Sequence, residues 1–127
     1  MTERTEQHQL VKLSDSDFRL EAPEQDVRGL DVYDRDGREI GSVDDLYVDT
    51  EERKIRFLDV GAGGILGIGE KQLMIPVEAV ADIGEDGVTI EHGREKVTES
   101  PPFDTDVVPP TAAYQREVYD YYGYMSA

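Results

Sequence analysis

Short runs in which apolar and polar residues alternate fill the middle of the chain, from Gly29 to about His92, and most runs end at glycine or aspartate. Alternation with a period of two is typical of strands that bury one face, and Gly and Asp are typical of the tight turns between strands. No helical segments are interleaved with these runs, which excludes the crossover helices of a Rossmann-type sheet. The pattern therefore predicts an all-β core, a small and strongly bent antiparallel β-barrel of five to six strands.

Two turns in this region carry hairpin signals. The letters DRDG at 34–37 join two strand-like runs, and because Asp tolerates turn geometry while Gly accepts positive φ, they predict a hairpin. The letters GEDG at 84–87 predict a second hairpin in the same way. In the strand that follows it, we expect Val88 and Ile90 to point into the core.

Irregular positions in the runs predict bends in the strands. Around Gly41 the apolar residues leave clean alternation, so we expect a β-bulge there. In KIRFLDV, at 54–60, the apolar face changes sides after Phe57, as in a strand that is buried on both sides or coiled at a barrel corner. Pro76 cannot donate a ladder hydrogen bond, which favours an edge or bulged position for its strand.

Composition divides the chain into four segments. A polar N-terminal tail or clasp covers 1–25, the barrel covers 26–92, an extended Pro-rich connector covers 93–110, and a Tyr-rich helix or tail covers 111–127. In the last segment, Thr111 as N-cap and Gly123 as stop signal bound a short helix. A stripe along one face of this helix is a candidate interaction surface, which either packs on the chain's own barrel or docks on another chain. The stripe consists of Tyr114, Val118, Tyr121 and Tyr122.

The charge of the chain limits the classes of partner. Acidic residues outnumber basic ones by 29 to 13, which gives a net charge of −16 and an isoelectric point near 4.3. This charge repels phosphates and anionic lipid headgroups, so we expect no nucleic-acid partner. The excess of acids reflects either a high-salt cell interior or genomic bias. No stretch approaches the roughly 20 apolar residues of a membrane span, and no signal-peptide core is present, so we expect a cytoplasmic protein.

The glycine-rich stretch VGAGGILGIGEKQLMIP, at 60–76, is a candidate phosphate loop by composition only. Aligned on Gly64 and Gly69, a P-loop requires Lys and then Ser or Thr, whereas here a glutamate comes first. A dinucleotide fingerprint requires a third glycine where Leu66 stands. We therefore expect a structural loop or contact surface and no cofactor. Large aliphatic side chains on a glycine frame are poorly placed facing water, so we expect a tail or another subunit to cover three of them: Ile65, Leu66 and Ile68.

Other candidate chemistry is sparse. If DRDG is aligned with the middle of an EF-hand loop, Val32 and Val43 fall where the first ligand and the bidentate glutamate belong, so we expect no metal site. His8 and His92 are far apart in the sequence, and no nucleophile elbow or cysteine is present, so we expect no enzyme. Asp59 is the one acid in an apolar setting, and we expect it to be a hydrogen-bonded structural carboxylate.

The order of these features resembles the PRC-barrel domain. The series runs from Gly29 with DVYD, through the Asp-Gly turn, IGSVDDLYVD, IRFLDV and the glycine loop, to LMIPVEAV, and it covers about 26–91. This module is shared by the cytoplasmic part of the photosynthetic reaction centre's H subunit and by the C-terminal domain of the ribosome maturation factor RimM. The resemblance implies a small β-barrel that serves docking or assembly, usually without catalysis.

The resemblance leads to an expectation about function. The chain shows neither the membrane-spanning helix of the reaction-centre protein nor the N-terminal domain of RimM, so we expect a free-standing member of the family. We expect a non-catalytic module for protein–protein interaction or assembly that self-associates or binds another protein. One alternative is an accessory component resembling the reaction-centre protein, which supports electron and proton transfer. A weaker alternative is a RimM-like ribosome assembly factor or a weak cation binder.

Overall fold

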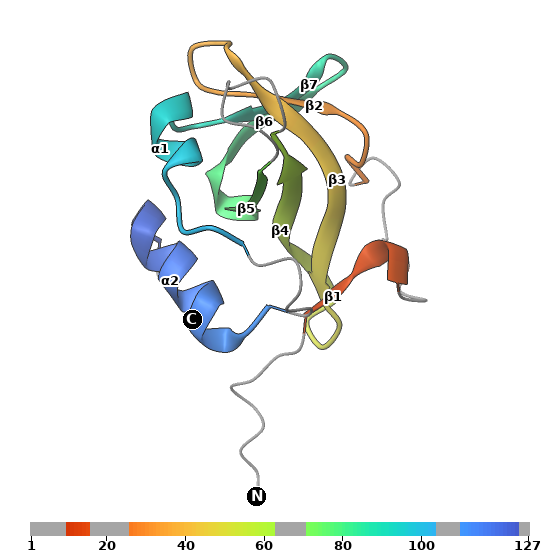
Figure 1. Ribbon diagram of the computed structural model, residues 1–127. Coiled ribbons are helices and arrows are strands. Elements are labelled where there is room, and N and C mark those ends of the chain that lie inside the picture. Colours follow the sequence, from red (N-terminus) through yellow and green to blue (C-terminus); the bar gives the residue numbers. More distant parts are fainter. Residues whose placement is uncertain (1–9, 16–25, 63–70, 104–109, 125–127) are drawn as a thin grey trace, which may run out of the picture.

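The computed structural model describes residues 10–15, 26–62, 71–103 and 110–124, which form one curled sheet with two helices (Figure 1). Six of the seven strands follow the order β5-β4-β3-β2-β7-β6, and the seventh, β1, pairs with β3 beside this path. The strands are β1 (Leu10–Lys12), β2 (Asp31–Tyr33), β3 (Glu39–Asp49), β4 (Lys54–Gly61), β5 (Gln72–Pro76), β6 (Val80–Gly84) and β7 (Gly87–Ile90). The helical elements are the short 3-10 turns η2 (Leu13–Asp15) and η4 (Val77–Ala79) and the helices α1 (Arg94–Thr98) and α2 (Ala112–Tyr122).

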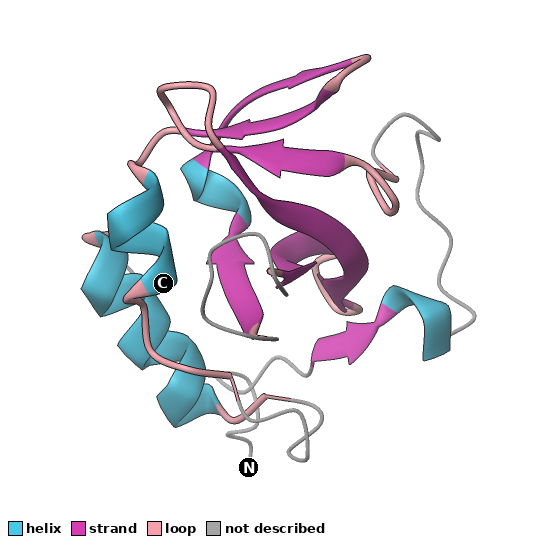
Figure 2. Ribbon diagram, turned by 45° about the horizontal axis from the view of Figure 1, so that its top comes forward, coloured by secondary structure: helices cyan, strands magenta, loops and turns pink. Residues whose placement is uncertain are grey.

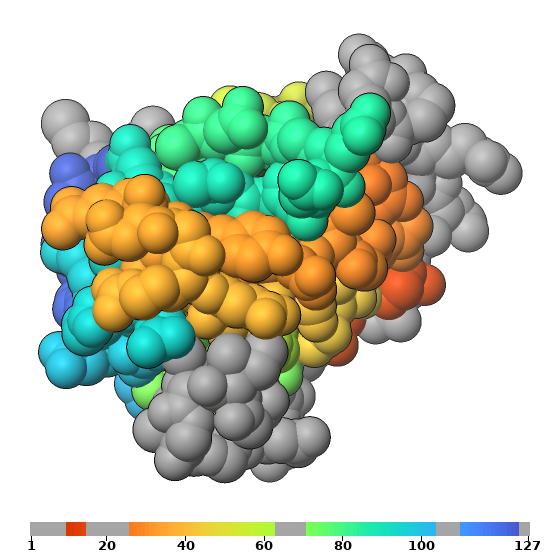
Figure 3. All heavy atoms as spheres, turned by 90° about the horizontal axis from the view of Figure 1, so that it is seen from above, coloured from red at the N-terminus to blue at the C-terminus, as the bar shows by residue number. Residues whose placement is uncertain are grey.

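The predicted all-β core with a C-terminal helix is confirmed, with two differences in the sheet. First, the sheet is mixed, because β2 pairs with β7 in parallel through Val32 and Val88. Figure 3 shows β2 and the β6–β7 hairpin side by side on the upper face. Second, the curl is not closed, because the strand order runs from β5 to β6 without a ladder between these two strands in the described part of the chain.

Strand β3 is long and strongly curved (Figure 1). Its first part pairs with β2, its last residues pair with β1, and its other edge pairs with β4. The register with β2 shifts between Gly41 and Glu39, which confirms the bulge expected beside Gly41. A Cβ on Gly41 would lie 2.1 Å from the carbonyl oxygen of Gly61, so glycine lets β3 and β4 approach closely at the bend.

Two apolar clusters lie on opposite faces of β3, β4 and β5. Neighbouring residues of a strand point to opposite faces, and both faces of these strands are buried. The inner cluster lies inside the curl and takes Leu46, Leu58 and Ile75 from these strands. The outer cluster takes Tyr47, Phe57 and Met74, and it is completed by Leu10, Phe103, Val118, Tyr119 and Tyr122. The prediction that β4 is buried on both sides is therefore confirmed, and Pro76 lies in an end strand, as expected.

Helices α1 and α2 lie along the same side of the sheet (Figure 2). Helix α2 has the predicted ends: the Thr111 side chain accepts a hydrogen bond from the Tyr114 backbone N–H (3.1 Å), and Gly123 is left-handed with φ of 87°. Helix α1 was not predicted, since its residues were expected in an extended connector. Its formation depends on distant residues: the Arg94 N–H donates to the Asp34 carboxylate (2.9 Å), and Val97 is fully buried.

Candidate functional site

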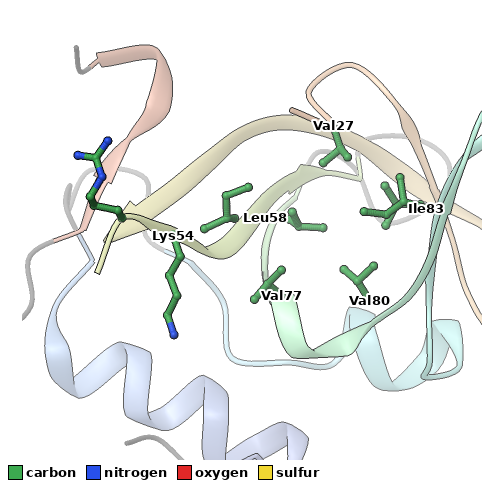
Figure 4. A pocket seen from close by; sticks show the side chains of 9 residues that line it. Val27, Lys54, Leu58, Val77, Val80 and Ile83 are labelled. Carbon is green, nitrogen blue, oxygen red and sulfur yellow. The ribbon is translucent and has the colours of Figure 1, made fainter. Parts of the chain in front are cut away.

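An apolar pocket opens where the curled sheet does not close. It has a volume of about 280 Å³ and lies between the start of β4 and the β6–β7 hairpin (Figure 4). Its wall is lined by Val27, Arg53, Lys54, Ile55, Leu58, Val77, Val80, Ile83 and Val88. Seven of these nine residues are aliphatic, so the pocket favours an apolar occupant.

The pocket is the accessible end of the inner core. Leu58 and Val88 belong to the inner cluster and are buried, while Ile55 and Val80 pack against that cluster and are partly exposed. Because no ladder joins β5 to β6 in the described residues, no strand covers the core at this point. Ile83 stands at this opening with 50% of its surface exposed, and it is the only large apolar residue exposed to this extent within the described ranges.

The two ends of the pocket differ in the side chains that line them. Figure 4 shows Lys54 at one end of the row of aliphatic side chains and Ile83 at the other. The Lys54 ammonium pairs with Glu52 at 3.1 Å, with both side chains largely exposed. Next to Ile83, β6 carries Asp82, and the hairpin turn that follows carries the exposed residues Glu85 and Asp86. Arg53 and Lys54 therefore line the β4 end of the pocket, whereas the acids of β6 and its turn are not among the lining residues.

The predicted stripe on α2 faces the chain's own sheet. Val118 and Tyr122 are buried in the outer cluster, and Tyr114 and Tyr121 are partly buried at its border. The Tyr121 hydroxyl donates to the Lys96 carbonyl oxygen at 2.6 Å, and the Tyr114 hydroxyl donates to the Pro101 carbonyl oxygen at 3.0 Å. The packing on the chain's own barrel is thus present, while contact of these residues with a second chain stays a prediction.

Tyr119 was missed by the sequence reasoning, although it belongs to the buried face of α2. Its ring lies 5.3 Å from that of Phe57, and its hydroxyl accepts a hydrogen bond from Arg56 at 3.0 Å. Burial raises the pKa of Tyr119, while the Arg56 hydrogen bond lowers it, and the balance is a raised pKa. A wider apolar stripe, as core-facing helices usually have, would have included this residue.

The loop aliphatics Ile65, Leu66 and Ile68 lie outside the described residues, so their expected cover stays a prediction. The pocket residues were not singled out from the sequence. The one local signal was Ile83, a large aliphatic residue directly before the GEDG turn, where a polar residue is usual.

Asp59 is a hydrogen-bonded carboxylate, as expected. It is 4% exposed, and its Oδ1 accepts a hydrogen bond from Gln72 Nε2 at 2.6 Å, while the same amide also donates to Asp44 at 2.9 Å. Burial raises the pKa of Asp59 above its usual range. The Gln72 amide thus donates hydrogen bonds to two carboxylates on neighbouring strands, Asp44 on β3 and Asp59 on β4.

Asp34 is a buried acid that organises the DRDG turn, and the sequence did not single it out. Its two oxygens accept hydrogen bonds from the backbone N–H groups of Asp36, Arg38 and Arg94 and from the Arg38 guanidinium, at 2.8 to 2.9 Å. Burial raises the pKa of Asp34, but these hydrogen bonds outweigh burial and lower it below the usual value. Both oxygens are engaged by donors, so this carboxylate joins the turn to α1.

His92 also takes part in a contact between the barrel and the C-terminal segment. Its Nε2 lies 2.9 Å from the Tyr124 hydroxyl oxygen, and that hydroxyl donates to Glu91. Burial lowers the pKa of His92. Over the ranges that the structure describes, no group of three or more His, Asp or Glu side chains is arranged to hold a metal ion.

The family model for the PRC-barrel domain matches residues 24–97, which is 74 of the 127 residues. The chain belongs to the PRC-barrel family. The PRC-barrel match includes strands β2 to β7 and all nine residues that line the pocket, whereas α2 lies beyond it. The pocket thus lies within the matched region, and α2, which covers the outer face of the sheet, lies outside it. No curated protein matches the chain.

None of the helices in the described segments is long and apolar enough to cross a membrane.

Proposed function

We propose that this PRC-barrel protein is a non-catalytic module for protein–protein interaction and assembly, and that it self-associates. The observation that carries the proposal is the open apolar pocket with the half-exposed Ile83 at its border. Apolar surface in contact with water is unfavourable, and a docked protein removes it from water. The outer face of the sheet is covered by the chain's own α2, so the pocket is the apolar surface that the described residues leave to a partner.

The buried ionisable groups support a role without catalysis. Asp34 is fully engaged by donors, Asp59 is held by Gln72, and His92 contacts Tyr124. None of the three lines the apolar pocket. Asp59 is the protonatable acid that an accessory role in proton transfer would require, but its burial keeps it from a contact surface.

Sedimentation velocity on the full chain tests the proposal, over a hundredfold range of protein concentration and from low salt to molar NaCl. We expect a dimer or larger species whose fraction grows with protein concentration. A species that sediments as a monomer under all of these conditions would refute self-association.

A further inference from the structure

We propose that the pocket and the edge of β6 together bind an extended segment of a partner protein, in which aliphatic and basic residues alternate. The segment adds an antiparallel strand to β6, places an aliphatic side chain at the pocket and directs basic side chains to the other face of the sheet. This inference rests on the proposed role in protein–protein interaction, names the chemistry of the partner at that site, and does not depend on self-association.

The edge of β6 offers backbone groups to an added strand. Strand β6 lies at one end of the sheet, and within the described residues it pairs only with β7. A turn of two residues joins the two strands, so Gly84 and Gly87, which flank the turn, form a hydrogen-bonded pair. Hydrogen-bonded and non-hydrogen-bonded pairs alternate along an antiparallel ladder, so Ile83 and Val88 form a non-hydrogen-bonded pair. The backbone N–H and C=O of Ile83 therefore point away from β7, toward the edge where a partner strand adds.

Ile83 also connects this edge to the apolar pocket. Its side chain lines the pocket together with Val80 of the same strand, and Figure 4 shows these two residues on one side of the pocket and Leu58 on the other. Residues that pair across a ladder share a face, with Cβ atoms about 4.5–5.5 Å apart. The residue of an added strand opposite Ile83 thus places its side chain at the pocket. An aliphatic side chain there removes the half-exposed Ile83 and its aliphatic neighbours from water.

The other face of β6 favours basic residues in the partner. Asp82 pairs with Thr89 and lies on the face opposite to Ile83, because neighbouring residues of a strand alternate between faces. Asp82 is exposed, as are Glu85 and Asp86 in the turn. The residues before and after the aliphatic residue of the added strand point to this face, where a lysine or arginine lies beside Asp82. The net charge of −16 also attracts a cationic segment at long range.

A synthetic heptapeptide with capped ends, Lys-Val-Lys-Leu-Lys-Val-Lys, tests the inference by isothermal titration calorimetry with the full chain at about 0.15 M NaCl. The matched control peptide contains the same residues in two blocks, with the four lysines first. It has the same charge without the alternation, so we expect its dissociation constant to be at least tenfold higher. Equal affinities of the two peptides would show that charge alone drives binding and would overturn the inference.

Methylation of backbone nitrogens in the peptide separates strand addition from burial of side chains alone. In an antiparallel ladder, the residue opposite Ile83 directs its own N–H toward β6, whereas the N–H groups of its two neighbours point away. Methylation at the three aliphatic residues is therefore expected to raise the dissociation constant at least tenfold, and methylation at the lysines less than threefold. Equal effects, or the reverse order, would overturn the antiparallel addition.

Two pairs of full-length variants locate the site. Ile83→Asp is expected to weaken binding of the cationic peptide at least tenfold although it adds a negative charge, whereas Ala113→Asp adds the same charge at an exposed position of α2 and is expected to bind like the wild type. Asp82→Asn is expected to weaken binding about threefold, and Asp120→Asn, also exposed on α2, is expected to leave it unchanged. Ile83 is half exposed, so circular dichroism is expected to show the wild-type melting curve for Ile83→Asp. Binding by Ile83→Asp at wild-type affinity would overturn the site.

The outcomes separate this inference from the proposed self-association, which sedimentation of the chain alone decides. A chain that self-associates but does not bind the alternating peptide overturns the inference and leaves the proposed function standing. A monomeric chain that binds the peptide refutes self-association and supports the inference. A peptide affinity that falls as the protein concentration rises would show that a second copy occupies the pocket, and it would overturn the inference.

Discussion

Val118 of α2 offers a direct test of whether the C-terminal helix packs on its own sheet in solution. The side chain is fully buried against the outer cluster, so Val118→Ala removes two buried methyl groups, or about 1.6 kcal/mol at about 0.8 kcal/mol each. The cavity left behind adds to this loss, whereas the higher helix propensity of alanine offsets roughly 0.5 kcal/mol of it. We expect the free energy of unfolding to fall by about 1.5–2.5 kcal/mol.

Urea unfolding followed by circular dichroism measures this loss. With a slope of about 1–3 kcal/mol per molar urea, the midpoint is expected to fall by roughly 1 M. Glu117→Ala is the matched control, because Glu117 is the exposed neighbour in the same helix, and its midpoint is expected to stay within about 0.3 M of wild type.

The dependence of this stability loss on protein concentration distinguishes packing on the same chain from packing on another chain. A helix that packs on its own chain unfolds with it, so the shift caused by Val118→Ala is the same at any protein concentration. A helix that packs on another chain gives a shift that changes with protein concentration. A Val118→Ala variant as stable as Glu117→Ala, or a loss that depends on protein concentration, would refute packing on the chain's own sheet.

Three further substitutions test other parts of the fold. Asp34→Ala leaves several hydrogen-bond donors without their carboxylate, so we expect the free energy of unfolding measured in urea to fall by about 3 kcal/mol. The control Asp36→Ala, whose side chain is exposed, is expected to cost less than about 0.5 kcal/mol. Equal losses for the two variants would contradict the role of Asp34. Because the pKa of Asp59 is raised, the wild type loses stability as pH rises from about 4 through that raised pKa. The free energy of unfolding of Asp59→Asn is therefore expected to increase relative to that of the wild type over this pH window. A constant difference between the two unfolding free energies from pH 4 to 8 would show that the carboxylate is not buried. Gly41→Ala places a methyl group 2.1 Å from the Gly61 carbonyl oxygen and should cost about 2 kcal/mol or more, so an unchanged melting temperature would disprove the close approach of β3 and β4.

The parts of the fold that depend on neighbouring residues could be predicted from the sequence. The DRDG hairpin follows from Asp34 and Gly37, and Gly37 has the positive φ of 85° that the turn requires. The ends of α2 follow from a capping threonine and a left-handed glycine, both of which act within a few residues. Such features are encoded locally, so they can be recognised before the fold is known.

The parts that were missed depend on residues far apart in the chain. Helix α1 starts where the side chain of Asp34, 60 residues earlier, accepts a hydrogen bond from the Arg94 N–H. The parallel pairing of β2 with β7 likewise leaves no trace in a local pattern. The pocket exists because the sheet stays open between β5 and β6, and alternation within a strand does not report on which strands pair. For this reason the sequence predicted the β core but not the apolar pocket that the structure leaves open.

The parallel pair of β2 and β7 also has a consequence for the order in which a newly made chain can fold. Val32 cannot pair until Val88 has been made, and the 56 residues between these positions (88 − 32) take roughly 3–11 s to synthesise at about 5–20 residues per second. During that time β2 can pair with β3, but its other edge has no native neighbour. Strand β2 is only three residues long, which limits the stretch of backbone that it offers to nascent chains on neighbouring ribosomes.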